Sequence, residues 1–213
     1  MMKHSLCMES IRILLALACQ LKFKLYQMDV KTAFLNGILK EDVNMAQPKG
    51  FINLHFPDHV LYLKKALYGL KQAPRAWYDR LTQYLVSYGF TRGKAVQTLC
   101  IKREDGKLIV AQVYIDDIIF GSTKDELAHD FSKLMQAKFE MSMIGELTHF
   151  LRLQIHQQDS GIFLFQSKYA KNLVKKFGLE SVSTLTLIGQ GMLMIERVLQ
   201  GVVFMWEIIL SPG

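Results

Sequence analysis

Apolar residues recur at helical spacing in four segments of the chain. In residues 10–22, for example, Ile11, Leu14, Ala18 and Leu21 fall on one face of a helix, which is the pattern of a helix that packs against a core. The other three segments carry residues that commonly begin or end helices: Ala73-Pro74 with Gly89, a capping box from Thr123 to Glu126, and Ser167 with Gly178. Trp77 lies in the apolar stripe of the first of these three, so we expect it to be buried. We therefore predict four amphipathic helices.

Strand patterns occupy the intervals between these helices. Alternating polar and apolar residues predict a strand over 23–30 that ends near Asp29. Two apolar runs joined at Asp116-Asp117 predict a hairpin, and a second hairpin is centred on Asp159–Gly161. Because strands, hairpins and helices mix without regular βαβ alternation, we predict an α+β fold, in which helices pack on one face of an antiparallel sheet.

Composition and charge narrow the range of partners. The chain has 213 residues, of which 50% are hydrophobic and 21% charged, a globular composition that is long enough for one core. Its net charge of +7 favours a polyanion such as nucleic acid, with an anionic membrane surface or ordinary solubility charge as alternatives. The three cysteines are widely spaced, which disfavours a disulfide framework and a zinc site. No uncharged window is long enough to span a membrane.

Asp116 and Asp117 are adjacent carboxylates between two β-prone runs. Neighbours on a strand point to opposite faces, so this pair can face one ligand only at a turn. Asp29, at the end of its own predicted strand, is the best candidate for a third carboxylate. Three carboxylates at one place repel each other unless cations are present, and Mg²⁺ prefers oxygen ligands. From the residues alone, a two-metal nucleotidyl-transfer site competes with a solvated Asp-Asp turn that has no function.

Three long blocks carry a resemblance to one protein family. They read YQMDVKTAFLNG (Tyr26–Gly37), LKKALYGLKQAPRAWYDRL (Leu63–Leu81) and YIDDIIFGST (Tyr114–Thr123). Their residues, order and spacing resemble the polymerase motifs of copia-type (Ty/copia) LTR retrotransposon reverse transcriptases. The likeness extends over about residues 9–180. It implies a reverse transcriptase (RNA-directed DNA polymerase) domain of a Pol polyprotein, with a palm-like fold and partial fingers.

The resemblance also implies roles for individual residues. Asp29, Asp116 and Asp117 would be catalytic and would bind two Mg²⁺ ions, or Mn²⁺ in their place, with the carbonyl of Val30 as an added ligand. Phe34 would be the steric gate beneath the sugar of the incoming deoxynucleoside triphosphate, with a core phenylalanine as the alternative. The remaining nucleotide-binding positions would be Gly69, Lys71, Gln72, Ala73, Pro74 and Arg75.

A further set of residues would contact the DNA primer and the RNA or DNA template. These are Tyr114, Arg152, Lys168, Lys171 and Lys175. The three lysines form one basic stripe on the fourth predicted helix, with Lys176 beside it, and such a stripe neutralises phosphates without reading sequence. A solvated charged face is the alternative for this stripe, and also for Lys71 and Arg75.

The chain also departs from the family. Residues 1–8 do not match its basic finger strands, and the divergent apolar residues 181–213 do not match the thumb-like segment expected next, so we expect a fragment of a decayed element. Arg152 follows Phe150-Leu151, where the family has glycine. The likeness predicts two-metal reverse transcription. The departures favour the alternative, a catalytically inactive remnant that at most binds nucleic acid. The family implies an intracellular location, in the cytoplasm or a virus-like particle. We expect no membrane partner, with a peripheral membrane protein as a third alternative.

Overall fold

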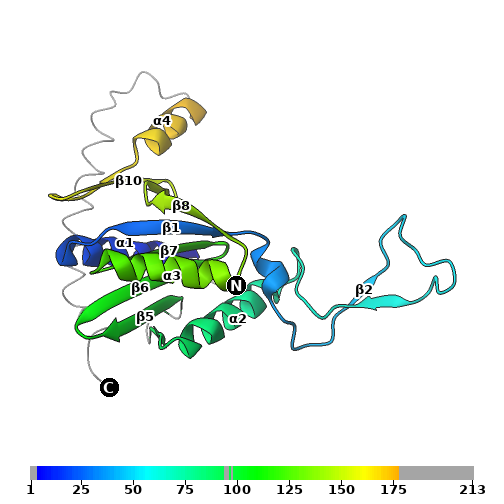
Figure 1. Ribbon diagram of the computed structural model, residues 1–213. Coiled ribbons are helices and arrows are strands. Elements are labelled where there is room, and N and C mark those ends of the chain that lie inside the picture. Colours follow the sequence, from blue (N-terminus) through cyan, green and yellow to red (C-terminus); the bar gives the residue numbers. More distant parts are fainter. Residues whose placement is uncertain (1–3, 94–95, 97, 178–213) are drawn as a thin grey trace.

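The computed structural model describes residues 4–93, 96 and 98–177 of the protein. Its largest unit is a six-stranded sheet in the order β4-β5-β6-β7-β1-β8, in which neighbouring strands are antiparallel (Figure 1). The strands of this sheet are β1 (Leu25–Val30), β4 (Thr91–Arg92), β5 (Leu99–Glu104), β6 (Lys107–Tyr114), β7 (Asp117–Ser122) and β8 (Met141–Glu146). The predicted α+β class, the antiparallel sheet and the first predicted strand are confirmed.

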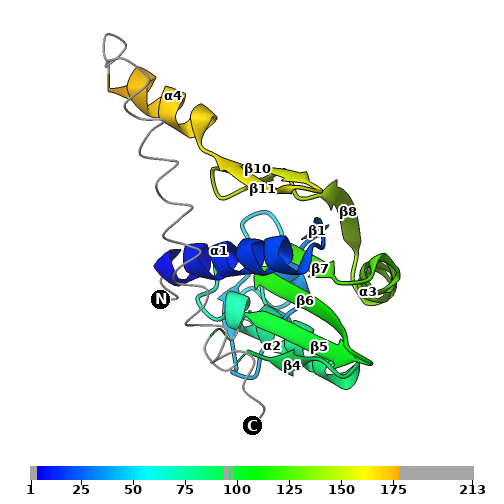
Figure 2. The same cartoon turned by 90° about the vertical axis from the view of Figure 1, so that its left-hand side faces the viewer.

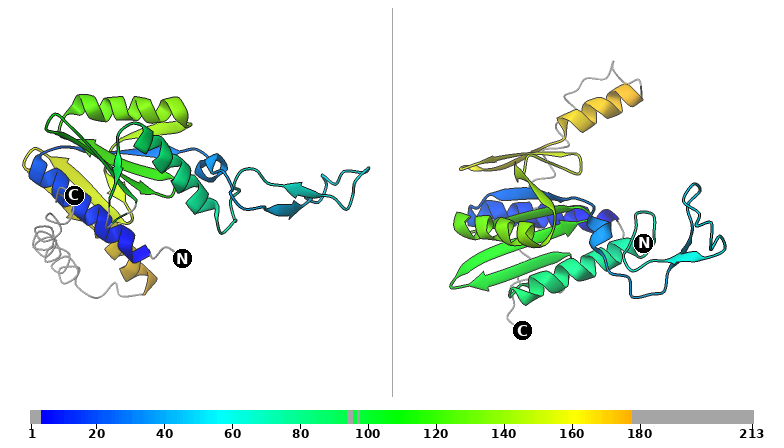
Figure 3. Two further views of the ribbon diagram at one scale, coloured as in Figure 1. Left: turned by 90° about the horizontal axis from the view of Figure 1, so that it is seen from below. Right: turned by 45° about the vertical axis from the view of Figure 1, so that its right-hand side comes forward.

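Each face of this sheet carries its own apolar core, because successive side chains of a strand point to opposite sides. On one face, Ala111 packs in a core with α2 (Ala73–Ser87) and α3 (Asp125–Lys138), and on the other, Val110 packs in a core with α1 (His4–Leu21). Figure 3 shows α1 on the side of the sheet opposite to α2 and α3. The prediction that the helices pack on one face is therefore wrong, since α1 covers the second face.

All four predicted helices are present, but their predicted caps are wrong at two places. α3 begins without a side-chain cap, because Thr123 Oγ1 instead accepts a 3.0 Å hydrogen bond from the N–H of Leu108. α4 (Ser167–Lys176) begins at its serine rather than after it, and has no side-chain cap. The expected helix end at Gly178 and the apolar segment 181–213 lie outside the described residues. Among the helices of the described ranges, none is long and apolar enough to cross a membrane.

A three-stranded antiparallel sheet follows β8 and leads to α4 (Figure 2). Its strands are β9 (His149–Phe150), β10 (Leu153–Gln158) and β11 (Gly161–Phe165). The second predicted hairpin, centred on Asp159–Gly161, is confirmed: β10 and β11 are paired on either side of Asp159. Phe150 and Ile155 belong to the core beneath α1, so this small sheet packs on the same face of the main sheet as α1.

The part of the chain that links β1 to α2 forms a thin arm, which extends away from the main sheet (Figure 1). It contains the 3-10 turn η1 (Ala33–Asn36) and a hairpin made of β2 (Asn44–Ala46) and β3 (Val60–Tyr62). Apolar side chains of the arm lie at the surface, where Phe51 is 82% exposed and Leu54 91% exposed. The outer part of the arm therefore adds little to either core.

Candidate active site

Two aspartates face each other across β1 and β7, two neighbouring interior strands of the main sheet. Asp29 on β1 and Asp117 on β7 are direct partners in the antiparallel register, so their side chains leave the same face with Cβ atoms ~4.5–5.5 Å apart. Leu25 and Ile119 point to this face as well, and both belong to the core beneath α1. Two segments that are distant in the sequence therefore bring their carboxylates side by side.

Asp116 lies in the two-residue turn that joins β6 to β7. Tyr114 and Asp117 are the last paired residues of this hairpin, so the turn consists of Ile115 and Asp116, one residue earlier than predicted. Ile115 has a φ of 52°, a left-handed conformation that is rare for a β-branched residue. The N–H of Val30 donates a 2.9 Å hydrogen bond to the carbonyl of Asp116. This bond ties the turn to the end of β1.

The carboxylates of this cluster are costly to ionise together. Burial is the main cause that raises the pKa of Asp116, and the charges of Asp29 and Asp117 raise it further. Burial also raises the pKa of Asp117; a 2.8 Å hydrogen bond from Gln27 Nε2 opposes this rise, and the charge of Asp29 adds to it. Oδ1 of Asp116 is buried and has no hydrogen-bond partner among the described residues, which leaves a desolvated oxygen in the cluster.

The chemistry of these donors fits a hard divalent cation, although the side chains do not form a ready-made metal site. Within the described residues, no three His, Cys, Asp or Glu side chains are grouped so that they could hold a metal ion. Carboxylate oxygens are nevertheless the ligands that Mg²⁺ prefers, and Oδ1 of Asp116 is left unpaired within the part of the chain that the structure describes. A bound cation would also relieve the repulsion that raises the pKa of Asp116.

Phe34 borders the cluster on the side of the arm. It is half-buried in η1, and its ring centre lies 4.8 Å from that of Tyr68. Burial raises the pKa of Tyr68, and the charges of Asp116 and Asp29 raise it further. The phenol therefore lies within electrostatic range of these carboxylates. Phe34 is thus paired with a ring that lies near the carboxylates, and it also packs against the core shared by α2 and α3, so both alternatives given for it from the sequence stay open.

The predicted nucleotide-binding residues around the start of α2 are Gly69, Lys71, Gln72, Ala73, Pro74 and Arg75. Gly69 has a φ of 94°, a conformation that favours glycine. Pro74 occupies the first turn of α2, as predicted. Lys71 and Arg75 are exposed, so both cations can reach a bound anion or remain solvated.

Two contacts at the cluster were not predicted from the sequence. Gln27 bonds the carboxylate of Asp117, and Trp77 Nε1 donates a 2.9 Å hydrogen bond to the carbonyl of Ile115. A signal for the first contact existed, because Gln27 precedes Asp29 by two residues and therefore points to the same face of β1. No local pattern identified the second, since helical spacing predicted only that Trp77 is buried.

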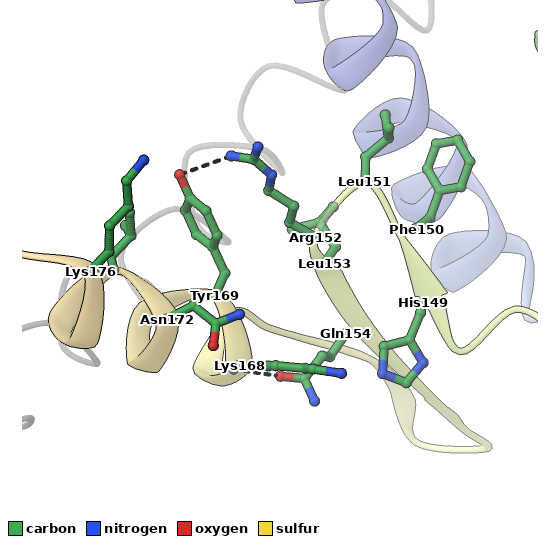
Figure 4. Close-up of a pocket in the computed structure, with 11 residues that line it drawn as sticks. His149, Phe150, Leu151, Arg152, Leu153, Gln154, Lys168, Tyr169, Asn172 and Lys176 are labelled. Carbon is green, nitrogen blue, oxygen red and sulfur yellow. Dashed lines mark hydrogen bonds between the residues drawn. The ribbon is translucent and has the colours of Figure 1, made fainter.

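A basic cleft lies between the β9–β10 turn and α4 (Figure 4). Its lining residues include His149, Arg152, Lys168, Tyr169 and Lys176, and none of the described residues that line it is acidic. Arg152 Nη1 donates a 3.0 Å hydrogen bond to the hydroxyl of Tyr169, and the guanidinium lies 4.7 Å from the centre of that ring (Figure 4). Arg152 has a φ of 72°, so an arginine adopts a backbone conformation that glycine favours.

The predicted primer and template residues divide between this cleft and the surface. Lys168 lines the cleft, whereas Lys171 and Lys175 do not. Tyr114 lies at the end of β6, and its ring centre is 5.4 Å from that of Phe150, which also lines the cleft. Aromatic contact therefore connects the strand that precedes the aspartate turn with the basic cleft.

Comparison with known proteins gives consistent matches. A sequence profile for reverse transcriptases (RNA-dependent DNA polymerases) matches residues 4–188. The chain is 36% identical over 177 residues to the retrovirus-related Pol polyprotein from transposon RE1 of Arabidopsis thaliana, a match that covers 83% of this chain and 12% of that protein. It is 34% identical over 181 residues to the retrovirus-related Pol polyprotein from transposon TNT 1-94 of Nicotiana tabacum, covering 82% of this chain and 13% of that protein.

A shorter relative matches a larger share of its own length. The chain is 35% identical over 135 residues to a putative transposon Ty5-1 protein of Saccharomyces cerevisiae, covering 63% of this chain and 44% of that protein. The chain thus spans only 12–13% of the length of the plant Pol polyproteins that it matches. No solved structure matches it.

Proposed function

Because this chain belongs to the reverse transcriptase (RNA-dependent DNA polymerase) family of copia-type retrotransposons, we propose that it transfers nucleotides to the 3′-hydroxyl of a primer in RNA-directed DNA synthesis. The observation that supports this most strongly is the pairing of Asp29 with Asp117 beside the turn that contains Asp116. Nucleotidyl transfer needs anionic oxygens at one place, where they can hold cations against a triphosphate. We further propose that residues 9–180, so far as the structure describes them, form a palm with partial fingers.

The metal-binding residues of this proposal are Asp29, Asp116, Asp117 and the carbonyl of Val30. Two Mg²⁺ ions, or Mn²⁺ in their place, would supply the positive charge that activates the 3′-hydroxyl and stabilises the leaving pyrophosphate. The protein contributes the positions of the carboxylates. β1 and β7 each have a neighbouring strand on both sides, and such a scaffold holds side chains with little reorganisation.

The incoming deoxynucleoside triphosphate would lie beside Phe34. The ring of Phe34 packs against that of Tyr68, with 4.8 Å between the ring centres, and this contact restrains its movement. A restrained ring is needed to reject a 2′-hydroxyl, because a mobile one would move aside. The exposed side chains of Lys71 and Arg75 would contact phosphate oxygens, which positions the nucleotide without reading its base.

The primer and the template would follow the basic surface between β6 and α4. At the β6 end of this surface, Tyr114 contacts Phe150. Phe150 also lines the basic cleft, which contains Arg152 and Lys168. The net charge of +7 supports a polyanionic partner, since electrostatic attraction to phosphates provides most of the sequence-independent affinity.

Nucleic-acid binding without catalysis is the second candidate function. One observation favours it: Arg152 has a φ of 72° at the position where the family has glycine, and its guanidinium bonds Tyr169. A turn that must accommodate this side chain cannot approach a primer as closely as a glycine turn.

Primer extension by the purified chain on an RNA template distinguishes the two candidates. We expect extension that depends on Mg²⁺ or Mn²⁺ and that Asp116→Asn abolishes. The matched control is Asp105→Asn, in the exposed β5–β6 turn, which should leave extension intact. Extension that survives Asp116→Asn would refute the assigned metal-binding residues. Binding of primer–template without extension by the unchanged chain would establish the second candidate.

A further inference from the structure

The indole of Trp77 bonds the turn that contains Asp116. Trp77 lies in α2 and is only 1% exposed. Its Nε1–H donates a 2.9 Å hydrogen bond to the carbonyl of Ile115. A residue of the second of the three sequence blocks, Leu63–Leu81, therefore supports the backbone of the third, Tyr114–Thr123.

The turn needs support from outside the hairpin because of Ile115. Its φ of 52° is a conformation that β-branched residues rarely adopt, and its side chain is 45% exposed. Burial of the side chain therefore does not offset the backbone strain. Two external donors hold the turn instead: the indole of Trp77 bonds the carbonyl of Ile115, and the N–H of Val30 bonds the carbonyl of Asp116.

Trp77 is itself held in place by packing. Its ring makes an edge contact with Phe139, with 5.1 Å between the ring centres, and it belongs to the core shared by α2 and α3. The backbone of α2 is also closely packed at this point: a Cβ atom at Gly37 would come within 2.8 Å of the backbone nitrogen of Trp77, so the chain passes too close for a larger residue. Packing therefore fixes the position of the indole N–H independently of its hydrogen bond to the turn.

We propose that Trp77 is a positioning residue for the active site: its indole N–H fixes the turn of Ile115 and Asp116, and thereby holds the Asp116 carboxylate beside Asp29. This inference rests on the proposed function, in which Asp116 binds metal. The competing explanation is that a buried indole simply needs an acceptor. In that case, loss of the N–H would lower stability without changing the turn or the affinity for metal.

The test compares Trp77→Phe with Tyr84→Phe in the full chain. Both residues lie in α2 and donate to a backbone carbonyl, and the Tyr84 hydroxyl bonds Leu134 in α3 at 3.0 Å, away from the turn. Two quantities are measured: the Mn²⁺ dissociation constant, by electron paramagnetic resonance, and amide hydrogen exchange over residues 113–118. We expect Trp77→Phe to weaken Mn²⁺ binding about 10-fold, as substitutions behind metal ligands commonly do, and to speed exchange in the turn. Tyr84→Phe should change neither quantity.

Ile115→Gly provides a second comparison that corrects for any loss of stability in Trp77→Phe. Glycine adopts a positive φ without strain, so the turn depends less on the indole. The loss of Mn²⁺ affinity caused by Trp77→Phe should therefore be smaller in the Ile115→Gly background. Equal losses in both backgrounds would count against a positioning role.

Failure of this inference and failure of the proposed function give different results. If the unchanged chain binds Mn²⁺ and Trp77→Phe changes affinity and exchange no more than Tyr84→Phe does, the positioning role is overturned. If the unchanged chain binds no Mn²⁺ but Trp77→Phe alone speeds exchange, the indole still positions the turn and it is the proposed function that fails.

Discussion

Gln27 on β1 and Asp117 on the neighbouring strand β7 are joined by a 2.8 Å hydrogen bond from the amide Nε2 to the carboxylate Oδ1. Gln27 precedes Asp29 by two residues on β1, so all three side chains share one face of the sheet. The amide opposes the rise in pKa that burial causes at Asp117. It thus favours the ionised form of one carboxylate without adding a charge to the cluster.

Gln27→Leu is expected to raise the pKa of Asp117, because burial and the charge of Asp29 remain while the donor is lost. Mn²⁺ binding requires deprotonated carboxylates, so its pH profile should move to higher pH. Mn²⁺ titrations at several pH values measure the shift, with Gln158→Leu on the exposed end of β10 as the control. An unchanged profile would show that this hydrogen bond does not tune the site.

Asp116→Asn is expected to stabilise the metal-free protein at neutral pH. The folded state raises the pKa of Asp116, so the folded chain binds this proton more tightly than the unfolded chain does. Its stability is therefore greatest below the unfolded pKa and falls as the pH rises through the folded pKa. At neutral pH the ionised carboxylate destabilises the fold, and the neutral amide removes this effect.

Thermal unfolding in the presence of a chelator measures this change. Asp116→Asn should have a higher Tm than the unchanged chain at pH 7, and the gain should shrink as the pH falls toward the ordinary pKa of a carboxyl group, about 4. Asp105→Asn should leave the Tm unchanged at both ends of the range. A lower Tm for Asp116→Asn at pH 7 would show that other contacts stabilise the ionised form.

Arg152→Gly is expected to be more stable than Arg152→Ala by about 1–2 kcal/mol, the usual cost of a left-handed conformation for a residue that has a Cβ atom. Both substitutions remove the contacts with Tyr169, so their difference isolates the backbone at a φ of 72°. Urea unfolding of the two variants measures it. Equal stabilities would mean that the turn changes conformation once the arginine side chain is lost.

Lys176→Ala is expected to weaken nucleic-acid binding more than Lys171→Ala, although both lysines lie in α4. Lys176 lines the basic cleft and Lys171 does not. If Lys176 contacts a phosphate, its loss should lower the slope of log affinity against log salt concentration by about 1. Fluorescence anisotropy with a labelled primer–template gives both slopes. A larger effect of Lys171→Ala would place the nucleic acid on another face of α4.

The parts of the site that the sequence predicted depend on local patterns. Asp116 and Asp117 lie between two apolar runs, which indicated a hairpin, and the structure places its turn one residue earlier. The position of Asp29 opposite Asp117 depends on the register of two distant strands. That register could not be derived from local spacing, and the expectation came from the chemistry of carboxylate clusters and from the family resemblance.

The parts that the sequence did not predict depend on side-chain direction and on competing partners. Helical spacing predicted that Trp77 is buried, but not that its N–H reaches Ile115. Thr123 has the spacing of a helix cap, but its hydroxyl oxygen accepts the N–H of Leu108 instead. Likewise, the apolar stripe in residues 10–22 predicted a packed helix, but not that this helix covers the face of the sheet opposite to α2 and α3.

The most direct test of the three-aspartate site is a crystal structure of the chain soaked with Mn²⁺, in which anomalous diffraction locates the ions. We predict two Mn²⁺ ions about 3.5–4 Å apart, coordinated by Asp29, Asp116 and Asp117. Carboxylates that bind no Mn²⁺, or ions held only elsewhere on the chain, would contradict this assignment.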